Sequence, residues 1–287
     1  MSMDHQTLSR IMLDEIHAAG GIVSIIFKDF DTGSIPFQFA PDYVVPSGNM
    51  AKIAILLAAL NRIQKGEMTL EKCVIVPNLW INYDSVAFER GQMSYSIDEL
   101  LSWMIVANED TAANVLIEIL GLNYINECCQ HYGLVNTRVE CRLGKTKVQD
   151  DLRLNVTSAR DILTFFEAMY RNTILSRPLC EYAGRLFLRQ RDHSGFTRYI
   201  CDDIYTGRLV SDTETVSHEA GIFYLRYVDY FLAVFNSDPV STPESRKASL
   251  QMRARISNLI YNYYLEREDT IRNLPFNPNA PYGENRY

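Results

Sequence analysis

Residues 46–60 read Pro-Ser-Gly-Asn-Met-Ala-Lys-Ile-Ala-Ile-Leu-Leu-Ala-Ala-Leu, and this stretch decides how the rest of the chain is interpreted. Pro46, Ser47 and Gly48 are turn residues, and a run of apolar helix-forming residues follows them. The pattern predicts a helix over 50–63. A run this apolar is typical of a helix buried within the protein, and it is too short to cross a membrane. Lys52 is therefore a candidate for a buried lysine.

Outward from this stretch, apolar periodicity and turn residues predict the other elements. Ser96 and Glu99 have the spacing of a capping box at a helix start, and Thr157 is the expected cap of the helix after it. The predicted helices are 4–19, 50–63, 96–105, 111–120, 124–132, 158–170, 178–191 and 244–266. The predicted strands are 22–30, 35–39, 216–221 and 227–235.

This order of elements predicts an α+β fold in which the two ends of the chain share one antiparallel sheet. Residues 1–45 and 204–270 would form a discontinuous α/β subdomain, with the terminal helices packed on the sheet. Residues 46–203 would form an all-α subdomain. Residues 271–287 carry three prolines and several asparagines, so an extended tail is expected there.

Composition excludes several classes of function. The formal net charge of −7 argues against a sequence-independent nucleic-acid surface, which needs clustered lysine and arginine. The 6 cysteines show no C-x-x-C pair and no metal-ligand spacing with histidine. They are expected to be reduced thiols of a cytoplasmic protein, since the N-terminus has no secretory-signal pattern. No metal, cofactor or membrane association is predicted, and the oligomeric state is left open.

Three segments carry chemistry, and their order matches a known signature. Asn49-Met50-Ala51-Lys52, Asn108-Glu109-Asp110 and Glu219-Ala220-Gly221 follow the order S-x-x-K, S-D-N and K-T-G. Thr111-Ala112-Ala113-Asn114 after the second segment resembles the SDNTAAN run of class A β-lactamases. The chain thus resembles the class A β-lactamase family over nearly its whole length, as a degenerate member. The resemblance implies a β-lactamase-like fold with a site between its two subdomains.

The resemblance also implies a changed chemistry. Asn49 stands where the family has its nucleophilic serine, and a carboxamide is a poor nucleophile. Asn108 stands at the proton-shuttle hydroxyl, and Glu219 at the cationic anchor for a substrate carboxylate. Asp151, in Asp151-Leu152-Arg153-Leu154-Asn155, is a loose echo of the family's deacylating glutamate. Ser47 is a weak candidate for a replacement nucleophile and is more readily explained as a cap or backbone-bonded hydroxyl.

The other candidate residues have structural as well as functional interpretations. Glu109 is expected to brace the loop, and Asp110 either contacts a ligand or pairs with Lys52. If Lys52 faces Glu109, Asp110 and Glu219, the cleft is net acidic and suits a cation. Tyr83, Tyr224, Ala220, Asn49 and Asn108 would line it, while His218 is expected to be a structural strand residue.

Three functions remain open. The first is a pseudoenzyme that has lost hydrolysis and binds a small molecule, with a cation as one candidate, in the old cleft. The second is a repurposed cyclase, isomerase or lyase, placed in natural-product biosynthesis, that uses Asp110, Glu219 and Lys52 for proton transfer. The third is a weak amidohydrolase in which an acid activates water.

Overall fold

The computed structural model describes residues 3–77, 81–82, 85, 87–89, 94–144, 154–201, 204–213, 215–226, 228–237 and 242–267. The helices are α1 (His5–Ala19), the 3-10 turn η1 (Gly48–Met50), α2 (Ala51–Gln64), α3 (Ile97–Val106), α4 (Asp110–Leu120), α5 (Leu122–His131), α6 (Ala159–Tyr170), α7 (Arg177–Leu188) and α8 (Pro243–Leu265). The strands are β1 (Ile22–Asp29), β2 (Phe37–Phe39), β3 (Val45–Pro46), β4 (Cys73–Ile75), β5 (Ser94–Ser96), β6 (Val156–Thr157), β7 (Tyr205–Asp212), β8 (Val216–Tyr224) and β9 (Asp229–Ser237).

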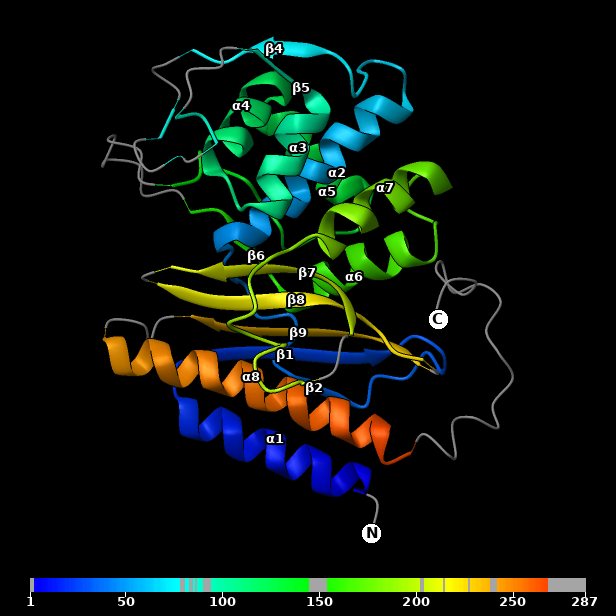
Figure 1. Ribbon diagram of the computed structural model, residues 1–287, viewed down its shortest axis with the longest axis vertical. Coiled ribbons are helices and arrows are strands. Elements are labelled where there is room, and N and C mark those ends of the chain that lie inside the picture. The colour runs from blue at the N-terminus through cyan, green and yellow to red at the C-terminus, as the bar shows by residue number, and fades with distance from the viewer. Residues whose placement is uncertain are drawn as a thin grey trace.

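One sheet organises the molecule. Its strands lie in the order β2-β1-β9-β8-β7, and each neighbouring pair is antiparallel. Strands from both ends of the chain therefore lie side by side, as the α+β prediction requires. Helices α1 and α8 cover one face, and the helices between β3 and β7 lie on the other (Figure 1). β7 is an edge strand, so one row of its backbone groups points out of the sheet.

Two apolar cores hold the layers together. Under α1 and α8, residues such as Leu8, Met12 and Ile256 pack on the sheet. On the other face the core is built around α2, which is buried continuously from Ala51 to Asn61. Lys52 lies inside this buried stretch with no exposed surface, as the apolar surroundings of the lysine in the sequence indicate.

Several predicted boundaries need correction. Strand β7 was not predicted at all, and β8 continues three residues beyond the expected end at Gly221. The cap of α6 is Ser158, whose side chain accepts a hydrogen bond from Asp161 N, and not Thr157, which belongs to β6. The capping box of Ser96 and Glu99 is confirmed in both directions.

Three further expectations concern the cysteines, the crossing of a membrane and the C-terminal tail. All six cysteines are free thiols in the structure. Among the described residues, no helix combines the length and the apolar character that spanning a membrane demands. The expected tail over 271–287 lies outside the described residues.

Candidate functional site

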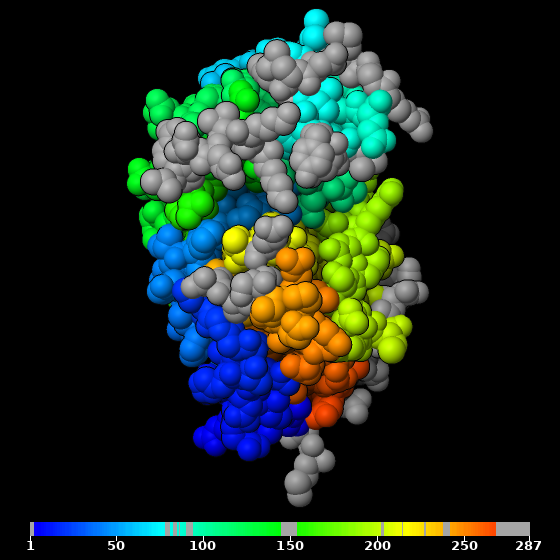
Figure 2. Space-filling model, turned by 90° about the vertical axis from the view of Figure 1, so that its left-hand side faces the viewer, coloured from blue at the N-terminus to red at the C-terminus, as the bar shows by residue number. Residues whose placement is uncertain are grey.

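The site is built around the turn that leads into α2. Gly48 has a left-handed φ of 50°, a conformation that glycine adopts readily, and it lies tightly against Ser211 and Val216 of the β7–β8 hairpin. A Cβ on Gly48 would lie 2.8 Å from Val216 Cγ2 and would overlap Ser211 Oγ. The turn and the hairpin meet on one side of the molecule, where Figure 2 shows the blue segment before α2 beside the yellow hairpin.

The strand that borders this turn is β7, and two carboxamides bind its edge. Asn49 Nδ2 donates to the carbonyl of Val210 at 3.1 Å, and Asn108 Nδ2 donates to the same carbonyl at 3.2 Å. The main-chain N–H of Asn49 donates to Ser211 Oγ at 2.9 Å. These bonds occupy the edge of β7 and the first N–H of the turn with groups of the protein itself.

Asn108 reaches this position from a left-handed backbone, with φ at 56°. Asparagine tolerates that region better than most residues, although it carries a cost for any residue other than glycine. Asn108 precedes α4, so Asn49 and Asn108 approach Val210 from the starts of two different helices. The Val210 carbonyl thus connects β7 to the starts of both α2 and α4.

Lys52 forms the floor of the site. Its Nζ donates to the carbonyl of Asn108 at 2.5 Å and lies 2.8 Å from Asp110 Oδ1. Burial lowers the pKa of the Lys52 ammonium, and the charges of Asp110 and Glu109 oppose that shift. Asp110 keeps 29% of its side-chain surface exposed, whereas Lys52 keeps none. A ligand approaching from solvent would therefore meet the carboxylate before the ammonium.

The segment that contains Glu109 is held by hydrogen bonds from Asn82 and Ser85. Ser85 Oγ donates a short hydrogen bond to Glu109 Oε1, and the N–H of Asn82 bonds to Thr111 Oγ1 at 3.0 Å. Glu109 therefore has the loop-holding contact that its position suggested. The predicted residues Asn49, Lys52, Asn108, Glu109 and Asp110 come together in one place.

Glu219 is not part of this place, which corrects the expectation of an acidic trio. It lies fully buried on β8, with its carboxylate 2.9 Å from Arg208 Nη1 and 3.8 Å from Arg253 Nη1 of α8. It also accepts a hydrogen bond from Phe196 N at 2.8 Å. Because Arg253 belongs to α8, this carboxylate faces the side of the sheet opposite Lys52. Burial raises the pKa of the Glu219 carboxyl, and the charges of Arg253 and Arg208 oppose the rise.

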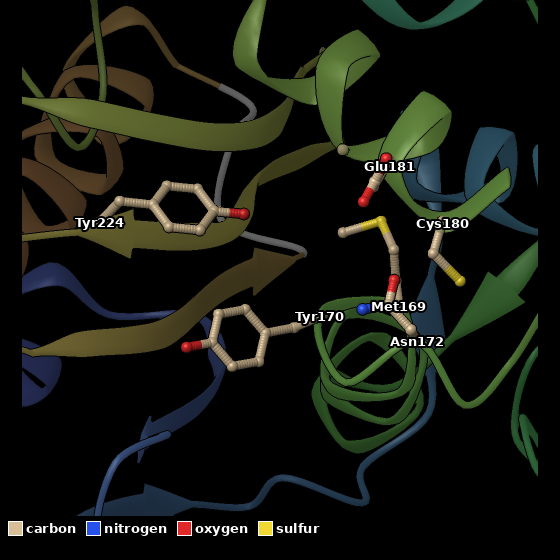
Figure 3. A pocket seen from close by; sticks show the side chains of 7 residues that line it. Met169, Tyr170, Asn172, Cys180, Glu181 and Tyr224 are labelled. Carbon is tan, nitrogen blue, oxygen red and sulfur yellow. The ribbon is translucent and has the colours of Figure 1, made fainter. Parts of the chain in front are cut away.

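The remaining predicted cleft residues also lie elsewhere. Ala220 is fully buried within the sheet, between Leu209 of β7 and Ala233 of β9. Tyr224 is five residues further along β8 than Glu219, which pairs with Val210, so it lies about 17 Å from the level of Val210. It lines a shallow pocket with side chains of α6 and α7 (Figure 3). Tyr83 and Asp151 lie outside the described residues.

Ser47 and His218 have structural contacts. The Ser47 hydroxyl donates to the carbonyl of Gly48 at 3.2 Å, so of its two expected structural roles it has the backbone-bonded one and not the side-chain cap. His218 Nδ1 accepts from Asn236 N at 3.2 Å, so its other nitrogen carries the proton and donates to Pro46 O at 2.9 Å. Burial, the largest effect, lowers the pKa of His218 to about 4. A neutral, buried imidazole thus ties β8 to the segment before α2.

This histidine predicts a pH-dependent loss of stability. Its pKa is lower in the folded than in the unfolded protein, so the unfolded state binds the proton first as the pH falls. The contribution of this imidazole to stability is complete above pH 6.5 and should fall by about 3 kcal/mol between pH 6.5 and 4. Urea unfolding of the unaltered protein and of His218→Gln across this range measures it. A difference between the two proteins that stays constant with pH would contradict the prediction.

The sequence missed the contribution of β7. Leu209, Val210 and Ser211 form the boundary of the site, and the adjacent apolar pair Leu209-Val210 was the available signal in a segment that is buried continuously from Gly207 to Ser211. It was obscured because the buried positions include Arg208 and Ser211, which do not look like core residues. Among the described residues, no group of three histidine, cysteine or acidic side chains is arranged to hold a metal.

Comparisons with known proteins identify the family and the fold. A family model described as "Beta-lactamase enzyme family" matches residues 6–264. A search of curated proteins found no match. Among solved structures, PBP-A has a TM-score of 0.80 at 20% identity over 90% of this chain and 96% of its own. TLA-1 extended-spectrum beta-lactamase has a TM-score of 0.82 at 14% identity over 92% and 100% of the two chains. A beta-lactamase from Sphaerobacter thermophilus DSM 20745 has a TM-score of 0.79 at 16% identity over 95% of this chain and 100% of its own.

Proposed function

We propose that this chain, which belongs to the beta-lactamase enzyme family, keeps the family's fold but forms no acyl-enzyme, and that it binds a small molecule beside Asp110. One observation carries the first part. The Asn49 N–H and both carboxamides at the start of α2 and α4 are already bound to Ser211 and Val210. An incoming acyl donor would need this N–H free, and it would need hydroxyl groups where the two carboxamides stand.

Acyl transfer needs a nucleophile, a proton shuttle and donors for the oxyanion. Asn49 and Asn108 have no hydroxyl, and neither carboxamide loses a proton near neutral pH. A main-chain N–H beside the nucleophile is a typical oxyanion donor, and here Ser211 Oγ takes it at 2.9 Å. We infer that β7, the edge strand bound to the turn, holds the counterpart of the third motif in place of β8.

The ligand-binding part of the proposal rests on Asp110 and Glu109. Without Glu219, the ionisable groups of the described residues that come together here are Lys52, Glu109 and Asp110. Lys52 is enclosed behind Asp110, whose carboxylate is partly exposed. A ligand that presents an N–H donor or an ammonium group is therefore favoured over a carboxylate. Because Glu219 lies elsewhere, the site has less negative charge than the sequence implied. Its preference for a full cation should therefore be smaller.

Three probes that share one ring test the ligand preference. Benzylamine, phenylacetamide and phenylacetate present a cation, a neutral amide and an anion. In thermal-shift titrations, the first two should raise the melting temperature of the unaltered protein and should do so less in Asp110→Asn. Stabilisation by phenylacetate alone would overturn the ligand preference and leave the absence of acylation untouched.

Acylation is tested with the single reversion Asn49→Ser. We expect no nitrocefin turnover and no penicillin adduct by intact mass spectrometry, either in this variant or in the unaltered protein. The hydroxyl is restored, but Asn108 and the bond between Ser211 and the residue 49 N–H remain. The solved PBP-A mutant that forms an acyl-enzyme complex with penicillin G provides a positive control. Turnover by Asn49→Ser would show that the carboxamide at residue 49 is the sole obstacle.

A second candidate function is acid–base chemistry by the buried pair of Lys52 and Asp110. The observation in its favour is the lowered pKa of a fully buried lysine, which suits a proton-transfer group. Glu219 no longer contributes, because its carboxylate lies on the other side of the sheet. Lys52→Met would abolish such an activity, whereas it should leave the ligand-induced thermal shift in place.

A further inference from the structure

Three exposed arginines at the C-terminal end of α7 and just beyond it have no carboxylate within 4.0 Å among the described residues. Arg177, Glu181, Arg185 and Arg189 follow one another at four-residue spacing, and Arg191 comes just after the helix. Glu181, the acidic residue in this helical series, pairs with Arg177 at 2.7 Å. Arg185, Arg189 and Arg191 are all exposed.

This arrangement departs from the way the chain treats its other arginines. Nine of the other 14 arginines that the structure describes lie within 4.0 Å of a carboxylate, namely Arg62, Arg138, Arg142, Arg160, Arg171, Arg177, Arg208, Arg253 and Arg255. Asp98, which lies across from α7, accepts a hydrogen bond from Tyr182 at 2.7 Å. Asp192, next in sequence to Arg191, accepts two bonds from Ser194. The neighbouring acids are therefore engaged by other groups.

The helix dipole explains part of the pattern. Cations near the C-terminal end of a helix are stabilised by it, which gives Arg185 and Arg189 a local role. It does not explain Arg191, which lies beyond the helix, or why no described carboxylate lies within 4.0 Å of any of the three. The row also lies beside the site, because Gln190 Nε2 donates to the carbonyl of Ile105, three residues before Asn108.

We propose that the row of Arg185, Arg189 and Arg191 binds a short acidic segment of a partner protein. Side chains four apart on a helix are about 6 Å apart, and alternate side chains of an extended strand are about 6.6 Å apart. Alternating carboxylates on an extended segment therefore match the spacing of Arg185 and Arg189. The planar guanidinium group also binds carboxylates through two parallel hydrogen bonds.

The charge of the whole chain favours a short segment over a nucleic acid. The formal net charge is −7, so a long polyanion would extend from the row over an acidic surface. A duplex carries one charge for about every 1.7 Å of its axis, which makes that repulsion large. A second copy of the same acidic chain is disfavoured for the same reason.

The test uses a fluorescein-labelled peptide of alternating glutamate and glycine residues, with a glutamine version as its control. By fluorescence anisotropy at low salt, the triple variant Arg185→Gln, Arg189→Gln and Arg191→Gln should bind about tenfold more weakly, because exposed ion pairs each contribute a few-fold. A triple variant of other exposed cations, Arg10→Gln, Lys72→Gln and Arg246→Gln, removes the same charge and should lose less than about twofold.

Each outcome decides the proposal. Selective loss in the first triple variant, with no binding of the glutamine peptide, supports it. Equal loss in both triple variants would mean that only net charge matters and would overturn it. Absence of saturable peptide binding to the unaltered protein, or tighter binding of a DNA duplex of 20 base pairs, would also overturn it.

Discussion

Replacing Glu219 with alanine is expected to destabilise the protein by about 3–5 kcal/mol, the usual cost of removing one partner of a buried ion pair. The carboxylate is fully buried between Arg208 and Arg253, and no solvent reaches it to compensate for its loss. The N–H of Phe196 would lose its acceptor as well. Urea unfolding at pH 7 measures the change.

The control for this variant is Glu118→Ala. Glu118 also pairs with an arginine, Arg142, but both side chains are more than one-third exposed, so the loss should stay below about 1 kcal/mol. If Glu219→Ala cost no more than this control and instead removed the stabilisation by benzylamine, Glu219 would be a ligand contact and its placement here would be wrong.

The second large effect is expected for Gly48→Ala, which should cost about 3 kcal/mol. A left-handed φ costs a residue with a Cβ about 1–2 kcal/mol, and overpacking in a tight site adds about 1–3 kcal/mol. The new methyl group would overlap Ser211 Oγ and crowd Val216. Moving the Ser211 side chain away from the new methyl group would strain the hydrogen bond between Asn49 N and Ser211 Oγ.

Gly33→Ala separates the two causes. Gly33 has a φ of 72°, and a Cβ there meets no atom within 4 Å, so this variant carries the backbone cost alone. The double variant Gly48→Ala with Ser211→Gly should recover part of the packing cost. Equal unfolding free energies for Gly48→Ala and Gly33→Ala would refute the claim that the hairpin presses on the turn.

The fold was largely predictable because local patterns and global packing agree in most segments. The apolar run of α2 indicated a buried helix, and Ser96 with Glu99 indicated the start of α3. The hairpin near the N-terminus was visible from its alternation and its turn residues. The capping box and the N-terminal hairpin depend on residues close to each other in sequence, and the burial of α2 shows in its own apolar run, which is why sequence patterns reveal these elements.

The third segment of the site could not be predicted in the same way. Glu219-Ala220-Gly221 occupied the expected place in the order of segments, but order does not determine which strand lies at the edge of a sheet. The polar side chains of β7 hid that strand, and one extra strand moves the boundary of the site by one position in the sheet. Charge alone then led to the expectation of an acidic trio.

The shared carbonyl of Val210 has a consequence for how this site can change over time. Asn49 and Asn108 both bind it, so a substitution at either one leaves the other still holding β7 to the helices. Restoring a hydroxyl at residue 49 or 108 alone leaves the main-chain N–H of residue 49 bound to Ser211 Oγ and one carboxamide still bound to Val210. The two carboxamides hold β7 redundantly, so each position can change while the other keeps the contact.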